Sequence, residues 1–443
     1  MSSATEHHGD HGHHAHAPRV LPQSLAAPPE LAVWRMRALI VGVVFGVVSL
    51  LAFCWTHEGR NHLLRAYLAG YMTCFNLAGG ALCVLMLQYV SGGKWGLLLR
   101  RPLEAMTRTL PLVAVLFIPI IALGRHLYQW MAYPTQETTQ GAFAQGVIDK
   151  EQALTANFKR PMLNPSMLIV ESVGIFAILL LFMYLLNKWS LQREADPARG
   201  TEASYEYWRT KFENLSGPGI LIYVIVMTVG AVVWIKSLDV TWYSSIWGLQ
   251  FLVAQGYGVL AFSILSVILL SRYEPMRTLL RTTEQHDLGK FLFAFVMLNI
   301  YLTFAEFLII WSGNLPDEIP WYLARIHGGW WTICSLDFIA HWLIPFTLLL
   351  SRDLKRNKRK MIWITCWMLF ARVVDMFWLV EPNFKYAAGN LVGEPLSVLA
   401  YFTVPVAMLG IWVAYYLTQL MQRPLVAVND PHLEEILEPE HAH

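Results

Sequence analysis

Residues 243–271, YSSIWGLQFLVAQGYGVLAFSILSVILLS, contain no Asp, Glu, Lys or Arg and are long enough to cross a lipid bilayer as one helix. Largely apolar runs of this length recur ten times along the chain. We expect all ten to be helices, because backbone groups in lipid must be paired within the segment and the alternating pattern of a transmembrane barrel is missing. The expected spans are 34–56, 64–90, 109–133, 163–188, 217–238, 243–271, 288–313, 320–351, 361–381 and 396–421.

The composition indicates a membrane protein rather than a soluble one. Of the 443 residues, 56% are hydrophobic and only 14% are charged, whereas about 25% are charged in a typical soluble domain. The five cysteines all fall in apolar runs and form no C-x-x-C pair. Iron–sulfur clusters, c-type haem and a disulfide framework are therefore not expected in this chain. We expect contact with membrane lipid and no binding of nucleic acid.

Charge placement and internal similarity predict how the spans are organised. Lys and Arg gather in the loops on one side of the spans, which places both termini in the cytoplasm by the positive-inside rule. RRPLEAMTRTL at 100–110, after span two, resembles SRYEPMRTLLRT at 271–282, after span six. This similarity predicts two related four-helix bundles, made of spans two to five and of spans six to nine.

Two terminal regions are expected to flank the membrane domain of residues 34–421. Residues 1–33 are rich in His, Gly, Ala and Pro, and this composition predicts a disordered tail. Its histidines have no fixed spacing, so we expect no metal site there. Residues 422–443 are acidic and are expected to form a solvated cytoplasmic tail.

Several polar side chains lie inside spans seven to nine. A charge at the bilayer centre costs roughly 2.5–3.5 kcal/mol, so such side chains normally face a bundle interior or a wet cavity. Asp337 and His341 are four residues apart, and Arg372 and Asp375 are three apart, so each pair shares a helix face. The set is consistent with a proton path, since His and buried carboxyl groups can exchange protons, and equally with paired charges that only join helices. The candidates are Tyr301, Glu306, His327, Asp337, His341, Arg372 and Asp375.

A second polar group is expected near the outer ends of spans three and four. It consists of Arg125, His126, Gln129 and Glu171. A His beside a carboxylate suits quinol oxidation, because each quinol hydroxyl needs a proton acceptor within hydrogen-bond reach. A His–Glu pair is also a common contact between membrane helices, so both interpretations stay open.

The spacing of two histidines suggests haem but does not complete a haem site. His327 and His341 are fourteen residues apart on one expected helix, a spacing similar to that of the haem ligands on a cytochrome b helix. A bis-His haem needs further histidines on a facing helix, and the only other histidine expected within the membrane is His126. Two haems therefore cannot be ligated by this chain, and we expect none.

Five blocks of sequence, in order, resemble a known family. The blocks resemble the integral membrane subunits of alternative complex III, in the NrfD or polysulfide-reductase membrane-subunit family, and the similarity covers residues 34–421. They are GGKWGLLLRRPLEAMTRTLP at 92–111, TWYSSIWG at 241–248, IIWSGNLPDEIPWYLAR at 309–325, HWLIPFTLLLSRDLKR at 341–356 and ARVVDMFWLVEP at 371–382.

The resemblance implies an all-α integral membrane fold of two four-helix bundles and two peripheral helices. It implies a chain without a redox cofactor in a quinol:acceptor oxidoreductase of the bacterial inner membrane, in a respiratory or photosynthetic chain. The implied partners are a C-type paralogue that holds the quinol, an iron–sulfur subunit, multihaem c subunits and in some cases a terminal oxidase. Subunits of the F type are expected to lie beside the C-type subunit and have been proposed to conduct protons.

The resemblance leaves three roles in view. The first is an anchoring subunit that conducts protons through the second bundle. The second is direct quinol binding near His126 and Glu171, although the quinol-binding paralogue usually has Asp where this chain has Glu171. The third is a purely structural scaffold. A self-standing transporter is disfavoured, because the two halves start on the same side and their Gly and Pro breaks do not correspond.

Overall fold

The computed structural model describes residues 20–316, 318–384 and 395–437 of the chain. The structure is 81% helical, without a β-strand in those residues. Ten helical segments are long and apolar enough to cross a membrane. The expected all-α, multi-pass membrane fold is confirmed.

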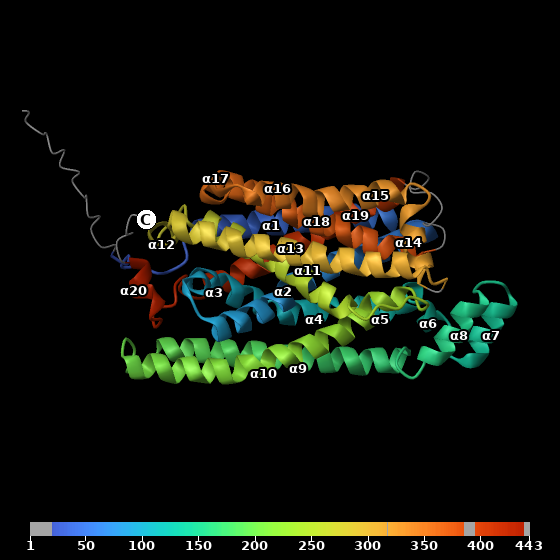
Figure 1. Ribbon diagram of the computed structural model, residues 1–443, viewed down its shortest axis with the longest axis horizontal. Helices are drawn as coiled ribbons and strands as arrows, with labels where there is room; N and C mark the ends of the chain where they lie inside the picture. The colour runs from blue at the N-terminus through green and yellow to red at the C-terminus, as the bar shows by residue number, and fades with distance from the viewer. Residues whose placement is uncertain (1–19, 317, 385–394, 438–443) are drawn as a thin grey trace, which may run out of the picture.

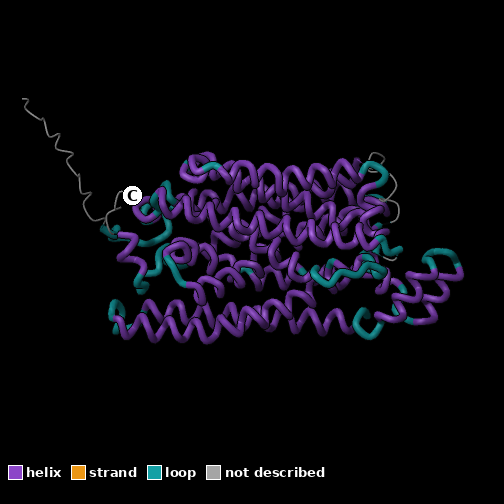
Figure 2. The backbone as a smooth tube through the Cα atoms, viewed as in Figure 1, coloured by secondary structure: helices purple, strands orange, loops and turns teal. Residues whose placement is uncertain are grey.

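The first half of the chain forms spans one to five and an extramembrane helical hairpin. Its elements are α1 (Glu30–Phe53), α2 (His57–Ser91), α3 (Lys94–Thr107), α4 (Leu110–Leu116), α5 (Ile118–Leu123), η1 (Gly124–His126), α6 (Gln129–Ala132), α7 (Gln136–Ala144), α8 (Lys150–Lys159), α9 (Pro165–Glu194), α10 (Glu202–Trp234) and η2 (Lys236–Leu238). Thr135 and Asp149 each begin a helix of the α7–α8 hairpin with a reciprocal capping box. The hairpin projects beyond the ends of the long helices (Figure 2).

The second half forms spans six to ten. Its elements are α11 (Trp247–Leu270), α12 (Met276–Leu279), α13 (Thr282–Gly313), α14 (Ile319–Ile326), α15 (Trp330–Asp337), η3 (Phe338–Leu343), α16 (Ile344–Leu350), α17 (Arg352–Arg356), α18 (Lys358–Val380), η4 (Glu381–Asn383), α19 (Pro395–Met421) and α20 (His432–Leu437). Helices α12, α17 and α20 lie at one end of the molecule, and α6, α7, α8 and α14 lie at the other (Figure 1).

The long helices pack as two groups joined through α2 and α11. Helix α2 packs against α3, α4, α9 and α10, whereas α11 packs against α13 and α18, with α15, η3 and α16 beside them. Helices α2 and α11 also pack against each other, so the two expected bundles share one interior.

Helices α1 and α19 pack closely against each other outside the two bundles. A Cβ atom on Gly42 would stand 2.7 Å from the backbone nitrogen of Ile411, and one on Gly410 would stand 2.7 Å from the Cα of Gly42. Only glycine therefore permits this approach, as at other tight contacts between membrane helices. These are the two peripheral helices expected from the sequence.

The structure corrects both expected tails. Helix α1 begins at Glu30, and the carbonyl of Leu25 accepts a hydrogen bond of 2.8 Å from the N–H of Leu425. Leu425, Val426 and Ile436 are buried, so the segment from 422 to 437 is docked on the membrane domain rather than solvated. The contact also places the two ends of the described chain at the same end of the molecule. The N-terminal histidines lie outside the described residues.

The start of span three also differs from expectation. Residues 94–108 were expected to form a charged loop, but the span begins at Lys94 and α3 is almost wholly buried. Arg101 and Glu104 are three residues apart and bind each other inside the protein. The sequence-based prediction places them in a loop, because a hydropathy scale scores each charged residue separately and takes no account of ion pairing inside the protein.

Candidate functional site

The span that carries Asp337 and His341 is interrupted by the π-turn η3. In an α-helix, the N–H of residue 345 would pair with the carbonyl of His341, but Pro345 has no N–H. The phenol of Tyr257 in α11 donates a hydrogen bond to that carbonyl instead, at 3.0 Å. Pro345 therefore removes the bond that would keep this turn α-helical, and Tyr257 replaces it.

A second side chain completes the same turn. The N–H of Ile344 donates to the carbonyl of Ile339, five residues earlier, as in a π-helix. The carbonyl of Ala340 has lost its helical partner and accepts a hydrogen bond of 2.9 Å from the indole N–H of Trp367 in α18. Two neighbouring helices thus hold the turn, and turns of this type are frequent at functional sites.

The π-turn brings Asp337 and His341 against Asp375 of α18. One carboxylate oxygen or ring nitrogen from each of the three lies within 4.8 Å of the other two. The guanidinium of Arg372 donates to Oδ2 of Asp375 at 2.6 Å. Oδ1 of Asp337 and Nε2 of His341 are buried, and neither has a hydrogen-bond partner in the described part of the chain. We call these four residues the π-turn site.

The π-turn site offers two carboxylates and one imidazole to a common point. A divalent metal can use such ligands, but here it would have to share Asp375 with the positive charge of Arg372. Proton transfer does not compete with Arg372 in this way. A carboxyl oxygen and an imidazole nitrogen can pass a proton once they reach hydrogen-bond distance. The arrangement therefore favours proton transfer over metal ligation.

A cavity lies between Arg372 of the π-turn site and the first bundle. It has a volume of about 160 Å³ and is lined by Arg372 from α18 and by Thr73 and Asn76 from α2. The amide oxygen of Asn76 accepts from Nε2 of Gln255 at 3.2 Å, and the phenol of Tyr223 donates to Oε1 of Gln255 at 2.9 Å. The cavity is large enough for several water molecules, but most of its lining is apolar, and Thr73, Asn76 and Arg372 are the polar lining residues that water could bind.

Three of the seven expected path residues lie away from the π-turn site, and two of these, Tyr301 and His327, are exposed. Tyr301 is 67% exposed on the outer face of α13. His327 is exposed at the end of α14, where Gly328 and Gly329 adopt positive φ angles and separate α14 from α15. The expected placement of His327 inside span eight is wrong, because that span begins at Trp330.

Glu306 is buried but belongs to a different place in the bundle. Its Oε1 has no hydrogen-bond partner among the described residues, and Ser244, Gln250 and Lys236 are the groups that act on it electrostatically. No contact in the described residues joins Glu306 to the π-turn site. The sequence therefore predicts a single cluster where the structure has two separate polar groups.

The residues expected at a quinol site do not converge. Arg125 and His126 are exposed in η1, where Nε of Arg125 donates to Nε2 of His126 at 3.2 Å. The amide of Gln129 donates to Gln152 at 3.4 Å. Glu171 is half-buried in α9 and makes no contact with these three within the described part of the chain.

Aromatic side chains fill the interior of the first bundle at the level of α5 and the middle of α9. Phe75, Phe117, Phe176 and Trp234 pack with ring centroids 5.0–6.1 Å apart. The indole N–H of Trp234 donates to Oγ of Ser172 at 3.1 Å. A quinone head group would have to displace this packing.

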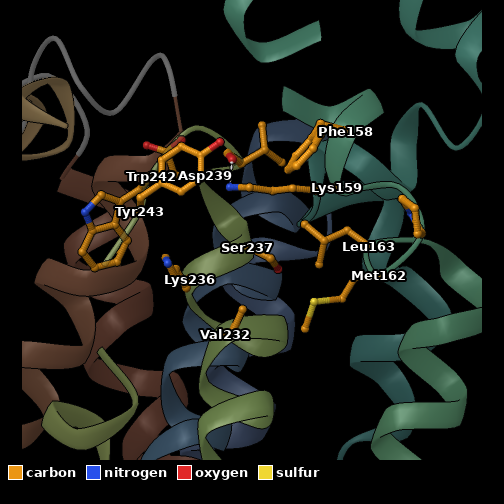
Figure 3. A pocket seen from close by; sticks show the side chains of 12 residues that line it. Phe158, Lys159, Met162, Leu163, Val232, Lys236, Ser237, Asp239, Trp242 and Tyr243 are labelled. Atoms are coloured by element: carbon orange, nitrogen blue, oxygen red, sulfur yellow. Dashed lines mark hydrogen bonds between the residues drawn. The ribbon is translucent and has the colours of Figure 1, made fainter. Parts of the chain in front are cut away.

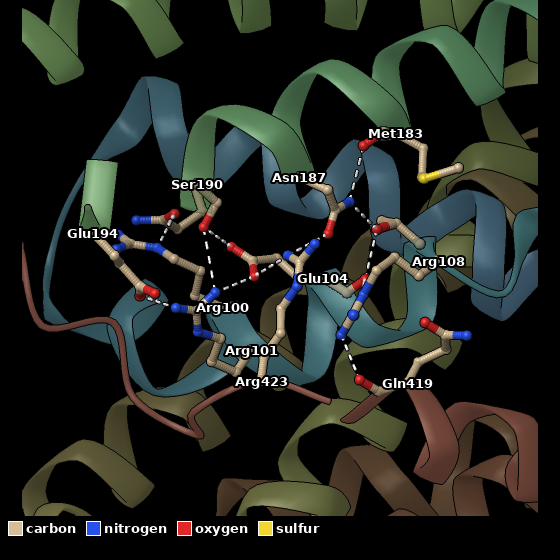
Figure 4. A network of polar contacts seen from close by, with 12 residues as sticks. Arg100, Arg101, Glu104, Arg108, Met183, Asn187, Ser190, Glu194, Gln419 and Arg423 are labelled. Atoms are coloured by element: carbon tan, nitrogen blue, oxygen red, sulfur yellow. Dashed lines mark hydrogen bonds and ion pairs between the residues drawn. The ribbon is translucent and has the colours of Figure 1, made fainter. Parts of the chain in front are cut away.

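A network of buried charges at the α20 end of the molecule was not predicted from the sequence (Figure 4). Glu104 is fully buried and accepts hydrogen bonds from Ser190 at 2.6 Å, Arg101 at 2.5 Å and Arg423 at 3.3 Å. Arg423 also donates to Asn187 at 2.9 Å. The network ties α3, α9 and the C-terminal segment together.

The same network extends along the C-terminal segment to Asp430. Arg100 lies 2.6 Å from Asp430, and Arg193 lies 3.9 Å from it. Burial by itself raises the pKa of Asp430, but the charges of Arg100 and Arg193 hold the pKa below its usual value. The C-terminal segment is therefore fixed by ion pairs as well as by apolar contacts.

A further buried group at the opposite end joins α2, α18 and α19. Glu381 accepts from Arg65 at 3.0 Å and from the phenol of Tyr401 at 2.8 Å. His62 lies 3.5 Å from the same carboxylate, so the first half of the chain does contain a buried histidine, whereas His126 is exposed. The expected count of histidines was wrong because span two begins earlier than hydropathy indicates.

The comparisons with known proteins do not assign the chain to a family. The sequence matches no family model, and it matches none of the curated proteins. The structure shows an all-α, multi-pass membrane protein with a buried polar site in its second bundle.

Proposed function

We propose that this chain is a membrane subunit of a quinol-oxidising complex of the alternative complex III type, and that it conducts protons through its second bundle. The observation that carries the proton role is the convergence of Asp337, His341 and Asp375 inside the membrane domain, within 4.8 Å of one another. Ionisable groups at such depth are costly and normally serve a pathway. The sequence blocks that resemble F-type subunits support the place in the complex.

The π-turn site contains the groups that a proton relay needs. Asp337 and His341 hold buried atoms without partners, so each can form a new hydrogen bond to a proton donor or to water. Arg372 binds Asp375 at 2.6 Å and stabilises its carboxylate form. The cavity beside Arg372 lies between the site and α2, and water held there by Thr73, Asn76 and Arg372 would be the proton donor that the proposal requires. Transfer would then run from this cavity through Asp375 to His341 and Asp337.

The proposal extends to cofactors, partners and location. We propose that the chain holds no redox group itself and that quinol, iron–sulfur clusters and c-type haems belong to partner subunits. The proposed membrane is the bacterial inner membrane, with both termini in the cytoplasm. The contact between Leu25 and Leu425 is consistent with termini on one side.

A structural scaffold is the second candidate. The buried groups around Glu104 and Glu381 join separate helices, as a scaffold requires, whereas the Arg372–Asp375 pair lies within α18. Direct quinol binding has less support, because His126 is exposed and separate from Glu171. The scaffold differs from the proton path in one respect: it requires the charges for assembly and not for transport.

Purification of the full chain from its native membrane tests the proposed complex. We expect it to co-purify with haem c and iron–sulfur subunits and with quinol oxidation, while the chain expressed alone shows no haem absorption. An Asp337→Asn variant separates the two candidates. The proton path predicts an assembled complex with fewer protons moved per electron, whereas the scaffold predicts an unchanged ratio with less assembled complex.

A further inference from the structure

A cavity of about 290 Å³ lies beside the α7–α8 hairpin and takes no part in the proposed function. It is enclosed by the end of α8, the turn before α9, the end of α10 and residues 239–243 (Figure 3). Span four begins at Pro165, span five ends at Leu238 and span six begins at Trp247. The cavity therefore opens where the spans end, at the depth of lipid head groups.

Two lysines form the polar wall of this cavity. Nζ of Lys159 donates to the carbonyl of Val240 and stands 4.0 Å from the ring centroid of Tyr243. Nζ of Lys236 donates to the carbonyl of Ser244 at 3.3 Å. Each ammonium has three N–H donors, and each of these bonds uses one of them. Donors on both lysines therefore remain for a ligand.

Two acidic groups lie near these lysines, and one of them, Asp239, lines the cavity and partly offsets the charge of Lys159. Oδ1 of Asp239 accepts hydrogen bonds from the N–H and the hydroxyl of Thr241, at 3.0 and 2.6 Å. Glu306 is the electrostatic partner of Lys236 but does not line the cavity. Burial, and then the neighbouring charge of Lys236, lowers the pKa of Lys159 to about 8. An anion in the cavity would relieve the repulsion that disfavours the charged form of Lys159.

Apart from Ser237 and Asp239, the rest of the lining is mainly apolar. Phe158, Met162, Leu163 and Val232 face the cavity, and Phe158 is 79% exposed. An apolar wall that continues into the spans, below a pair of lysines and the aromatic rings of Trp242 and Tyr243, matches an amphipathic anion. A small free anion would use the lysines but not the apolar wall.

We propose that this cavity binds an anionic phospholipid, with the phosphodiester between Lys159 and Lys236 and an acyl chain against Phe158, Met162 and Val232. The proposal does not depend on proton conduction. Basic residues near a membrane surface contribute about 1 kcal/mol each to binding of anionic lipid. Loss of both lysines is therefore expected to weaken binding at least tenfold.

The test compares phosphatidylglycerol, phosphatidylcholine and inorganic phosphate with the full chain in detergent. Bound lipid is counted by native mass spectrometry, and the thermal unfolding midpoint is measured with each additive. We expect phosphatidylglycerol to bind and stabilise, phosphatidylcholine to do so weakly, and inorganic phosphate to have little effect. The double variant Lys159→Gln/Lys236→Gln should lose the preference for phosphatidylglycerol.

The control is Lys150→Gln/Lys188→Gln, which removes two lysines outside the cavity lining. A further variant, Lys159→Arg, keeps the charge and should keep the preference even if Lys159→Gln lowers stability. Equal lipid binding by the double variant and the control would overturn the site. Stabilisation by inorganic phosphate equal to that by phosphatidylglycerol, lost in the double variant, would overturn the lipid assignment in favour of a free-anion site.

Discussion

The phenol of Tyr257 in α11 donates a hydrogen bond of 3.0 Å to the backbone carbonyl of His341, which Pro345 leaves without a helical partner. The Tyr257 ring also packs edge-on against the imidazole, with centroids 4.5 Å apart. Tyr257 therefore both pairs with a free carbonyl of the π-turn and holds the imidazole ring of His341 in place. The position of the imidazole follows from a backbone irregularity as much as from side-chain contacts.

Substitution Tyr257→Phe keeps the ring and removes the donor. The carbonyl of His341 is then buried without a partner, which costs about 1–3 kcal/mol. We expect a lower thermal unfolding midpoint in purified protein. Tyr184→Phe, on an exposed tyrosine of α9, is the matched control and should unfold like the wild type. An unchanged midpoint for Tyr257→Phe would show that the hydrogen bond does not support the turn.

Substitution Pro345→Ala restores the missing N–H. The turn can then close as an α-helix, in which each residue turns by about 100°, more than in a π-helix. This tighter winding rotates the two parts of the span relative to each other and carries His341 away from Asp375. We expect fewer protons moved per electron without a fall in the unfolding midpoint. Pro218→Ala, at an exposed proline inside α10, should change neither quantity. Normal proton movement in Pro345→Ala would separate the π-turn from function.

Acid should release the C-terminal segment through Asp430. Its pKa in the folded protein lies below its ordinary value of about 3.9, so its contribution to stability is complete above that value. It is lost as the pH falls through the lower pKa of the folded state. We expect limited proteolysis at residues 422–437 to become faster below about pH 4.

Two variants complete the pH experiment: one at the buried Asp430 and a control at the exposed Asp287. Asp430→Asn leaves Arg100 without its partner and should expose the segment at neutral pH, at a cost of about 3–5 kcal/mol for a broken buried pair. Its proteolysis should show little further change with acid. Asp287→Asn removes an exposed carboxylate and should behave like the wild type. The same acid response in Asp430→Asn as in the wild type would assign the response to other groups.

Hydropathy predicts the fold well because every helix that crosses a bilayer needs about 20 predominantly apolar residues. Residues 243–271 carry no charge on any side, and they contain α11 (Trp247–Leu270), which is largely buried. Charges that neutralise each other inside the protein are different. Arg101 and Glu104 have the hydropathy of a loop, and only the arrangement of α3 against α9 shows that they are buried.

The π-turn site was only partly predictable. Asp337 and His341 share a face by spacing, and Arg372 pairs with Asp375 as their spacing indicates. The approach of the two pairs depends on η3, for which Pro345 in HWLIP was the available signal. The sequence did not show that Tyr301 of α13 points away from the site. Helix α13 is apolar on both its inner and its outer face, so hydropathy does not tell the two faces apart.

The number of protons moved per electron tests the central claim most directly. The assembled complex is reconstituted into liposomes, and internal pH is followed while quinol oxidation is measured in the same sample. For Asp337→Asn we predict near-normal electron transfer with a lower proton-to-electron ratio, while Tyr301→Phe and Asp287→Asn keep the wild-type ratio. An unchanged ratio in Asp337→Asn, with electron transfer intact, would contradict a proton path through the π-turn site.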